Sequence, residues 1–379
     1  MFTLLEIMPH LMRPAGGGIP IYSTGDSAAM EIQSKLYGIL QKKSSFTQTE
    51  IDTLWKKSWA WLAKAKTVLI GVPSDTGAGI RRGAAYGPLG VRKELLKLKD
   101  FRDLIRNHRV VDLGDIFVNP HLLHDDMLSE EQKRLCRYEM YKNAPANIQS
   151  KLPVSPLSVA KVLFDSLTEA HPHLRIQIIG GDHSVAWPVT EVLAKKFPGT
   201  LGIVQSDAHT DLLPSRLGVK YCFGTWSYHA SALIGGNGKL VQLGIRQTGR
   251  DRNHWESTVA VKQFWAQEIN AHPKGTRRNE PIVIQQIIDH LKAKGVKQVY
   301  FSNDIDGTDE AEAPATGTPA REGLSSAFLL KVIQALGKNF DLVATDIMEV
   351  APVLGPDRRQ AEKTCRLAAT YLMECLRAP

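Results

Sequence analysis

The chain has 379 residues and a formal net charge of +8 at pH 7. Hydrophobic residues make up 43% and charged residues 23%, which is typical of a globular protein and excludes a disordered or fibrous chain. Lys and Arg are scattered without a nucleic-acid-binding motif, and no apolar run approaches the roughly 18 residues of a membrane span. We therefore expect neither a nucleic-acid nor a membrane partner.

The start of the chain and its cysteines are both typical of a cytoplasmic protein. The opening residues lack a basic start followed by an apolar run, so we expect a cytoplasmic protein. The cysteines are far apart in sequence and form no CxxC pair, which predicts free thiols rather than a zinc ribbon or a disulfide framework: Cys136, Cys222, Cys365 and Cys375.

The first part of the chain, residues 1–65, is predicted to be an N-terminal helical extension. After a Gly- and Pro-rich opening, a helical pattern runs from about Ser27 to Lys64. Trp55, Trp59 and Leu62 recur at helical spacing, with Trp61 beside them, and form one apolar face. We expect this face to pack either on the parent domain or on a neighbouring subunit.

From Thr67 onwards, short β-branched or apolar runs alternate with amphipathic helical patterns. This alternation predicts an α/β fold, a three-layer α/β/α sandwich with a mostly parallel sheet, over residues 66–379. The predicted strands are TVLIGV, RVVDLG, LRIQIIG, TLGIVQS, LVQLGI, QVYFSNDI and FDLVATDI. A polar stretch near residues 119–150 interrupts the pattern, and we interpret it as an insertion.

Residues of the metal-ligand type follow three of the predicted strands. Ligands bind beyond the carboxyl ends of the strands in open parallel sheets, so these positions are candidate site residues: His183, Asp207, His209, Asp211, Asp304 and Asp306. Spacing by two directs side chains to one side of an extended segment. Carboxylate oxygens with imidazole nitrogens suit Mn²⁺ or another borderline divalent ion, and four carboxylates carry the charge that two such ions cancel.

These segments resemble the arginase, agmatinase and formiminoglutamase (ureohydrolase) family. The similar motifs are GGDHS, SDAHTD and S-x-D-x-D, together with GVPSDTGAGIRRGAAYGPLGVRKEL, LGIR, TGTP and DIMEVAPVLGP, and the resemblance runs from about Lys66 to Ala378. It implies an arginase-like fold, a small-molecule guanidino substrate and a homo-oligomer, a trimer or hexamer.

The resemblance also implies roles for single residues. One metal ion would be held by His183, Asp207, Asp211 and Asp304, and the other by Asp207, His209, Asp304 and Asp306, so that Asp207 and Asp304 bridge. Two close cations would generate a bridging hydroxide that attacks the guanidinium carbon. Asp211 would accept the proton, and Glu349 would pair with the substrate's guanidinium.

The chain departs from the family pattern in the loops that face the substrate. Phe223 stands where most guanidine-hydrolysing relatives have a proton-shuttle histidine, so His229 or Tyr228 becomes a candidate shuttle, and His229 is equally a structural histidine. Gln247, Thr248 and Gly249 replace the acidic residues with which arginases hold the substrate's α-amino group. This replacement disfavours arginine as the substrate.

Two further features concern the choice of substrate. Asp309 and Glu310 stand where the family commonly has Asp-Pro, and Phe223 with Trp226 could form an apolar wall. ATGTP resembles the guanidine-hydrolysing branch, whereas the absent shuttle histidine resembles the formiminoglutamase branch. The two signals conflict.

The expected function is a binuclear metal-dependent amidinohydrolase that converts a non-arginine guanidino compound, agmatine-like or guanidino-acid-like, to urea and an amine. The expected ions are two Mn²⁺, with Ni²⁺ or Co²⁺ as alternatives. A formiminoglutamase-like hydrolase and a metal-binding pseudoenzyme remain open. A single-metal deacetylase is disfavoured, because His183 and Asp306 would have no second ion to bind.

Overall fold

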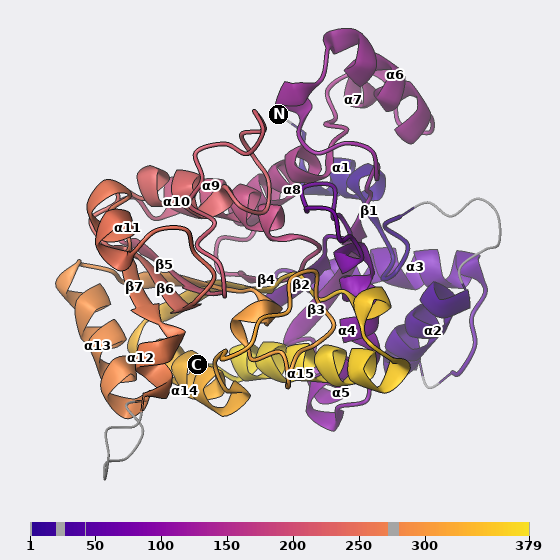
Figure 1. Ribbon diagram of the computed structural model, residues 1–379. Coiled ribbons are helices and arrows are strands. Elements are labelled where there is room, and N and C mark those ends of the chain that lie inside the picture. Colours follow the sequence, from indigo (N-terminus) through magenta and orange to yellow (C-terminus); the bar gives the residue numbers. More distant parts are fainter. Residues whose placement is uncertain (1, 20–26, 42, 272–279, 379) are drawn as a thin grey trace.

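A computed structural model describes residues 2–19, 27–41, 43–271 and 280–378. Its strands form one nine-stranded sheet in the order β1-β3-β2-β4-β9-β8-β5-β6-β7 (Figure 1). All neighbouring strands are parallel except β1, which is antiparallel to β3. The strands are β1 (Met12–Arg13), β2 (Thr67–Gly71), β3 (Val110–Ile116), β4 (Arg175–Ile179), β5 (Leu201–Ser206), β6 (Leu240–Ile245), β7 (Lys262–Trp265), β8 (Gln298–Asn303) and β9 (Asp341–Ile347).

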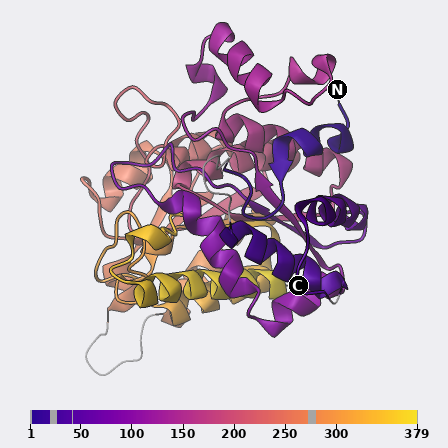
Figure 2. The same ribbon diagram turned by 90° about the vertical axis from the view of Figure 1, so that its right-hand side faces the viewer.

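Helices cover both faces of this sheet and give three layers. Figures 1 and 2 show α8, α9 and α10 on one face and α4, α14 and α15 on the other. The central strands are buried on both faces, which explains their near-continuous Val, Ile and Leu runs. The helices are α1 (Leu4–Leu11), α2 (Ser27–Gln41), α3 (Gln48–Ser58), α4 (Gly87–Leu95), α5 (Lys99–Arg106), α6 (Glu130–Met140), α7 (Ala146–Gln149), α8 (Pro156–Ala170), α9 (Ala186–Lys196), α10 (Trp226–Leu233), α11 (Arg252–Thr258), α12 (Ala266–Asn270), α13 (Glu280–Ala293), α14 (Ser326–Asn339) and α15 (Arg358–Arg377).

The fold class predicted from the sequence is confirmed, and all the predicted strands are present. β1, β7 and α1 were not predicted from the sequence. β1 is only two residues long and β7 four, and both are edge strands, so neither gives the long apolar run that marks a buried strand. No helix of the described residues is both long and apolar enough to cross a membrane.

The predicted apolar face of the N-terminal segment packs on the chain's own sheet. Trp55, Trp59 and Leu62 are buried, and the Trp55 Nε1–H donates to the Leu113 carbonyl in β3 at 2.8 Å. Trp61 lies outside this core and stacks on the His108 ring at 3.7 Å. Of the two expected partners, the parent domain and a neighbouring subunit, α3 therefore packs on the parent domain. The domain boundary at residue 65 stays a prediction.

A buried ion network ties the same segment to the sheet. Arg92 on α4 donates to Asp112 through Nε at 2.8 Å and Nη2 at 3.0 Å, and to Asp115 through Nη1. The other oxygen of Asp115 accepts the Gly16 N–H at 2.8 Å. Gly16 has φ +81°, a conformation that favours glycine. The segment after β1 is thus held by a carboxylate whose charge Arg92 balances.

The segment predicted to be an insertion projects from the body at the top of Figure 1. Its main helix, α6, has no buried residue, and it mixes basic and acidic side chains. At its start, Asp125 accepts the N–H groups of Val154 and Ser155, and the His124 ring lies 5.0 Å from the Tyr221 ring. The segment is therefore anchored at both ends, although its status as an insertion stays a prediction.

Candidate metal centre

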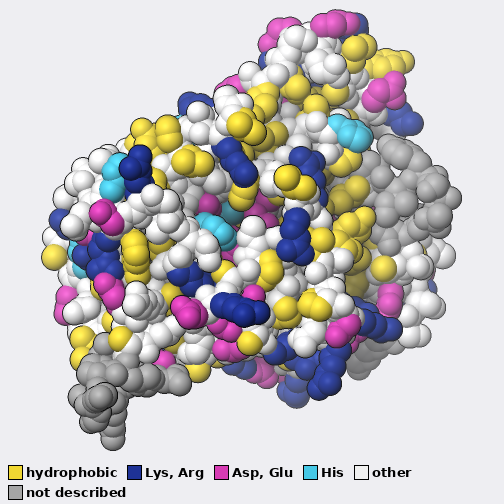
Figure 3. Space-filling model, viewed as in Figure 1, with side chains coloured by type: hydrophobic (Ala, Val, Ile, Leu, Met, Phe, Trp, Pro, Cys, Tyr) yellow, Lys and Arg dark blue, Asp and Glu magenta, His cyan; other side chains and the backbone are white. Residues whose placement is uncertain are grey.

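The candidate site residues lie at the carboxyl ends of neighbouring strands. His183 follows β4, Asp207 follows β5, and Asp304 follows β8. Because β4, β9, β8 and β5 are adjacent and parallel, these ends meet at the same edge of the sheet. Figure 3 shows acidic and histidine side chains in the floor of a hollow near the centre of this face, with Lys and Arg around it.

Three carboxylates surround one imidazole nitrogen and form a first cluster. The distance from His183 Nδ1 is 3.1 Å to Asp207 Oδ2, 3.2 Å to Asp211 Oδ2 and 3.2 Å to Asp304 Oδ2. All four side chains are buried. The ligand atoms of His183, Asp207 and Asp304 lie within 4.8 Å of one another, close enough to meet at a single cation.

A second cluster shares Asp207 with the first. His209 Nδ1 lies 3.2 Å from Asp306 Oδ2 and 3.5 Å from Asp207 Oδ1, so the two oxygens of Asp207 face different clusters. Asp304 Oδ1 accepts the Asp306 N–H at 2.9 Å. The structure thus brings all six predicted residues together and places Asp207 between the clusters. A bridging position of Asp304 stays a prediction.

Hydrogen bonds fix the tautomer of His183. The Ser302 hydroxyl donates to the Asp346 carboxylate, which also accepts from the Asn303 N–H and the Tyr300 hydroxyl. With its proton used in this way, the Ser302 oxygen accepts from His183 Nε2–H at 3.0 Å. His183 Nδ1 then presents its lone pair to the first cluster, where it has no hydrogen-bond partner.

The charges of the clusters fit a pair of divalent cations. Burial opposes a charge on either histidine, yet the surrounding carboxylates raise the pKa of His183 and raise that of His209 to about 12. Burial and the charge of Asp207 raise the pKa of Asp211 to about 6. Each cluster therefore attracts a cation to its imidazole nitrogen. Oxygen and nitrogen ligands without cysteine are those of Mn²⁺-type sites.

Residues 65–377 match a model described as the arginase family. This span is most of the chain. The chain belongs to the arginase family.

Curated relatives in this family are between a quarter and a third identical to the chain over the aligned residues. The mitochondrial agmatinase of Gallus gallus is 29% identical over 316 residues, 81% of this chain and 79% of that protein. The mitochondrial guanidino acid hydrolase of Homo sapiens is 27% identical over 323 residues, 81% and 76% of the two chains. Guanidinobutyrase of Pseudomonas aeruginosa is 26% identical over 308 residues, 78% and 82%.

Solved structures show the same fold. Proclavaminate amidino hydrolase of Streptomyces clavuligerus is 27% identical with a TM-score of 0.61 and covers 84% of this chain and 94% of its own. Formimidoylglutamase of Bacillus subtilis, at 21% identity and a TM-score of 0.63, covers 83% and 88% and shows the fold alone. The chain is thus a hydrolase of the arginase (ureohydrolase) family, and the family implies a binuclear metal site where the His and Asp clusters lie.

Glu349, the predicted guanidinium partner, lies beside the clusters. Its Oε1 accepts the His183 N–H at 3.0 Å, and it has φ +60°, which is uncommon for a residue other than glycine and marks a constrained site. Burial, and then the charge of Asp182, raise its pKa. A Cβ on Gly317 would lie 3.8 Å from Glu349 Oε2, so the ATGTP loop adjoins it. Its role in substrate binding stays a prediction.

A row of buried glutamines, which was not predicted from the sequence, supports Asp207 from the side. Gln205 Nε2 donates to Asp207 Oδ2 at 2.7 Å, and Gln242 Nε2 donates to Gln205 Oε1 at 2.8 Å. Gln263 Nε2 donates to Gln242 Oε1 at 2.8 Å, and Trp265 Nε1–H donates to Gln263 Oε1 at 2.9 Å. The row crosses β5, β6 and β7 in register. Its signal in the sequence is a glutamine within three consecutive strands.

The loop after Asp211 differs from two predictions. Trp226 does not line a substrate wall: its side chain is fully buried, and Nε1–H donates to Asp211 Oδ2 at 3.1 Å. His229 is not brought to the clusters. Its Nε2 lies 3.0 Å from the Pro214 carbonyl oxygen, and its ring packs against Trp187 and neighbouring aromatic rings. These contacts favour the structural reading of His229.

Arg246 holds loops together. So do Asp309 and Glu310, the pair at which the chain departs from the family pattern. Arg246 donates to the carbonyl oxygens of Asp306 at 2.6 Å and Ala320 at 3.0 Å. Asp309 Oδ2 accepts the Gly323 N–H at 2.9 Å. Glu310 pairs with Arg321 at 2.6 Å. These contacts orient the loop that carries Asp306.

Proposed function

We propose that the chain is a binuclear amidinohydrolase that cleaves the linear C–N bond of a non-arginine guanidino compound and releases urea and an amine. The observation that carries the proposal is the pair of clusters that share Asp207 and adjoin Glu349. Support comes from relatives whose names are agmatinase, guanidino acid hydrolase and guanidinobutyrase. A homo-oligomer and a cytoplasmic location remain part of the proposal.

The six clustered residues would hold the two ions, Mn²⁺ with Ni²⁺ or Co²⁺ as alternatives. When bound there, two divalent cations would lower the pKa of a water enough for it to act as a nucleophile near neutral pH. Glu349 accepts two N–H groups of the guanidinium and orients its planar carbon. Asp211, held by Trp226 through one oxygen, takes the proton and passes it to the leaving nitrogen, so the products are urea and the neutral or protonated amine.

The charge of Arg216 favours a guanidino acid over agmatine as the substrate. Arg216 is exposed and lies over the Phe223 ring at 4.6 Å, and Phe223 N–H donates to the Gly77 carbonyl at 3.1 Å. Gly77 N–H in turn donates to Asp182 Oδ2 at 2.9 Å, one residue before His183. A cation connected to the site by these contacts would attract a carboxylate tail and repel the second cation of agmatine.

Phe223 also favours a second candidate, a formimino hydrolase. Phenylalanine cannot transfer a proton, and the carboxylates of formiminoglutamate suit the same Arg216. The two candidates differ in their products, because only the amidinohydrolase releases urea.

The test is product release from a panel of guanidino and formimino compounds by protein loaded with Mn²⁺ or Ni²⁺. Urea from 4-guanidinobutyrate or 3-guanidinopropionate, and its loss in Asp207→Ala, is the expected result. Formamide from formiminoglutamate would instead establish the second candidate. No turnover with two ions bound would support a pseudoenzyme and refute both.

The preference for an acidic tail has its own variant. Arg216→Ala should raise the KM for the guanidino acid about fivefold, the effect of losing roughly 1 kcal/mol from a solvent-exposed charge pair. Leu217→Ala, in the same exposed turn, changes no charge and is the control. Equal KM changes in both variants would contradict a role for the Arg216 charge.

A further inference from the structure

Gly317, in the ATGTP loop, has two oxygen atoms on the side where a side chain would stand. A Cβ on Gly317 would lie 3.3 Å from the Arg81 carbonyl oxygen and 3.8 Å from Glu349 Oε2, and no other described atom beyond the adjacent residues would lie within 4 Å. The φ angle of Gly317 is outside the left-handed region, so the backbone conformation does not require glycine. The absence of a side chain therefore keeps a space open beside two hydrogen-bond acceptors.

Neither of these two oxygen atoms accepts a hydrogen bond from the part of the chain that the structure describes. Arg81 is exposed and belongs to the loop that follows β2. Glu349 is buried, and its other oxygen, Oε1, accepts the His183 N–H at 3.0 Å. Two acceptors on the open side of a glycine suit a ligand group that carries two N–H donors, and an –NH₂ of a guanidinium is such a group.

The loop that carries Gly317 is fixed between the second cluster and the glutamate. Thr318, the next residue, donates from Oγ1 to Asp306 Oδ2 at 2.7 Å. Thr316, the residue before it, forms an antiparallel bridge with Val350, which follows the glutamate in sequence. The space beside Gly317 is therefore held next to the residues that would bind metal and substrate.

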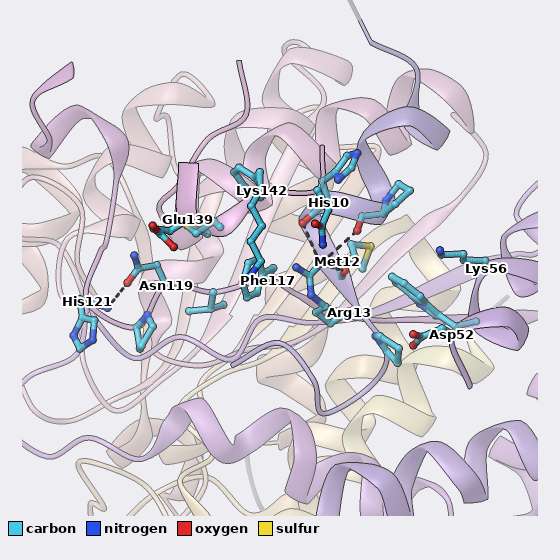
Figure 4. Close-up of a pocket in the computed structure, with 18 residues that line it drawn as sticks. His10, Met12, Arg13, Asp52, Lys56, Phe117, Asn119, His121, Glu139 and Lys142 are labelled. Carbon is cyan, nitrogen blue, oxygen red and sulfur yellow. Dashed lines mark hydrogen bonds between the residues drawn. The ribbon is translucent and has the colours of Figure 1, made fainter. Parts of the chain in front are cut away.

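This space is separate from the pocket of about 900 Å³ at the β1–β3 edge of the sheet (Figure 4). The metal clusters follow β4, β5 and β8, and β2 lies between β3 and β4. The wall of that pocket carries Asp52 and Glu139 as well as Lys56 and Lys142, so it offers no single charge to a ligand. Recognition of the reacting group therefore rests on residues at the clusters.

We propose that Gly317 is a specificity-determining residue through which the site selects a guanidino group over a formimino group. The inference rests on the proposed hydrolysis and deepens it, because the two candidate substrates differ at one position. A guanidinium carbon carries two –NH₂ groups, whereas a formimino carbon carries a hydrogen in place of one of them. The –NH₂ group that only the guanidinium has lies beside Gly317 and donates to Glu349 Oε2 and to the Arg81 carbonyl oxygen.

The selection follows from the acceptors that a formimino compound would leave without a donor. A site that hydrogen-bonds one group of its substrate rejects the analogue that lacks this group, because its own polar atoms then stay unpaired. Arg81 is exposed, so water offsets part of this cost at its carbonyl oxygen. We therefore expect a preference of about 10- to 100-fold, below the factors reached in closed sites.

The first experiment compares kcat/KM for 4-guanidinobutyrate and for its formimino analogue, which has the same tail, with Mn²⁺-loaded protein. Gly317→Ala places a methyl group against both acceptors and should lower kcat/KM for 4-guanidinobutyrate about tenfold or more. The formimino analogue has only a hydrogen at that place, so its kcat/KM should change less than twofold. The ratio of the two values thus separates lost selection from general damage to the site.

Gly224→Ala is the matched control. The φ of Gly224 is also outside the left-handed region, and its Cβ would meet only Leu213 Cδ1, at 4.0 Å, among the described atoms beyond its neighbours. This variant should leave the ratio of the two kcat/KM values within twofold of the wild-type ratio. Circular dichroism and the measured Mn²⁺ content verify that both variants fold and bind metal.

The second experiment measures binding without turnover, by calorimetric titration with guanidinium chloride and formamidinium chloride. Formamidinium also has a hydrogen in place of one –NH₂ group, so the wild-type protein should bind guanidinium about tenfold more tightly. Gly317→Ala should bind the two ions equally within twofold, whereas Gly224→Ala should keep the wild-type difference.

The two experiments separate the fate of this inference from that of the proposed function. Preferential guanidinium binding that only Gly317→Ala abolishes, without urea from any guanidino compound, supports the selection and refutes the proposed reaction. Urea release with the same ratio of kcat/KM in the wild type and in Gly317→Ala refutes the selection and leaves the reaction. Faster turnover of the formimino analogue by the wild type, or neither turnover nor guanidinium binding, overturns the inference.

Discussion

Ser302→Ala should weaken the binding of one metal ion without unfolding the protein. Ser302 Oγ lies 3.0 Å from His183 Nε2 and is the acceptor that leaves Nδ1 free to bind a cation. Asp346 would lose the serine but keep the Asn303 N–H at 3.0 Å and the Tyr300 hydroxyl, so it remains hydrogen-bonded. The lost stability should be about 1 kcal/mol.

The expected loss of metal affinity is larger than this loss of stability. Residues that orient a metal-binding histidine contribute about 10- to 100-fold in affinity, which corresponds to roughly 1.4–2.8 kcal/mol. The assay is Mn²⁺ titration of chelated protein against a competing chelator. The ion next to His183 should weaken by this factor, and the ion next to His209 much less.

Ser206→Ala provides a matched control. Ser206 ends the adjacent strand β5 and is equally buried, but its Oγ has no hydrogen-bond partner among the described residues. Its removal takes away the same atom without releasing a histidine, so Mn²⁺ affinity should stay within about twofold. Equal losses in the two variants, or unchanged affinity in Ser302→Ala, would refute the proposed orientation of His183.

Three further predictions concern charge, metal and the proton acceptor. Arg92→Met should lower the free energy of unfolding by about 3–5 kcal/mol in urea titrations, against about 0–1 for the exposed Arg134→Met. Burial raises the pKa of Asp115 above its value in the unfolded chain. As the pH falls, the folded Arg92→Met protein therefore takes up a proton on Asp115 before the unfolded chain does. Its loss in free energy of unfolding should thus become smaller between about pH 7 and about pH 5. Chelation should lower the unfolding temperature reversibly, since Mn²⁺ at 100 to 1,000 times its Kd adds about 3–4 kcal/mol; a temperature that does not respond to Mn²⁺ would contradict the assigned site. Trp226→Phe should lower kcat/KM about tenfold or more at unchanged metal content, because Asp211 loses a donor to a charged oxygen; metal loss instead would show that the indole only holds the ligands.

The cluster residues could be predicted from the sequence because ligands bind beyond the carboxyl ends of parallel strands, and locating those ends needs only the order of the elements. Asp207, His209 and Asp304 each follow an apolar run, and the parallel sheet brings such ends together whatever the details of packing. The same rule cannot find Ser302 or Asp346, which lie inside strands. Their signal is a polar residue in a buried apolar run, and only the register of β8 and β9 shows that they meet.

Loop residues were harder to place than strand ends. Trp226 and His229 are three residues apart, yet one lies under Asp211 and the other on an aromatic group beside Pro214. Their positions depend on how α10 turns away from the sheet, which no local pattern in the sequence encodes. The N-terminal β1 was missed because two residues of Met12 and Arg13 carry no periodicity, and pairing with β3 alone makes them a strand.

The hydrogen bonds of the glutamine row all point the same way, from Trp265 at the edge of the sheet to Asp207. An amide can be reversed without changing its shape, so each glutamine alone could face either way. An indole N–H can only donate, and a carboxylate can only accept. Because the Trp265 N–H donates, Gln263 accepts with its oxygen and so donates with its N–H to Gln242. Gln242 and Gln205 are oriented in the same way, so that a Gln205 N–H donates to the Asp207 carboxylate. A residue on β7, two strands from the end of β5 where Asp207 lies, thus contributes to the direction of the hydrogen bond that this ligand accepts, and it does so with groups that do not titrate near neutral pH.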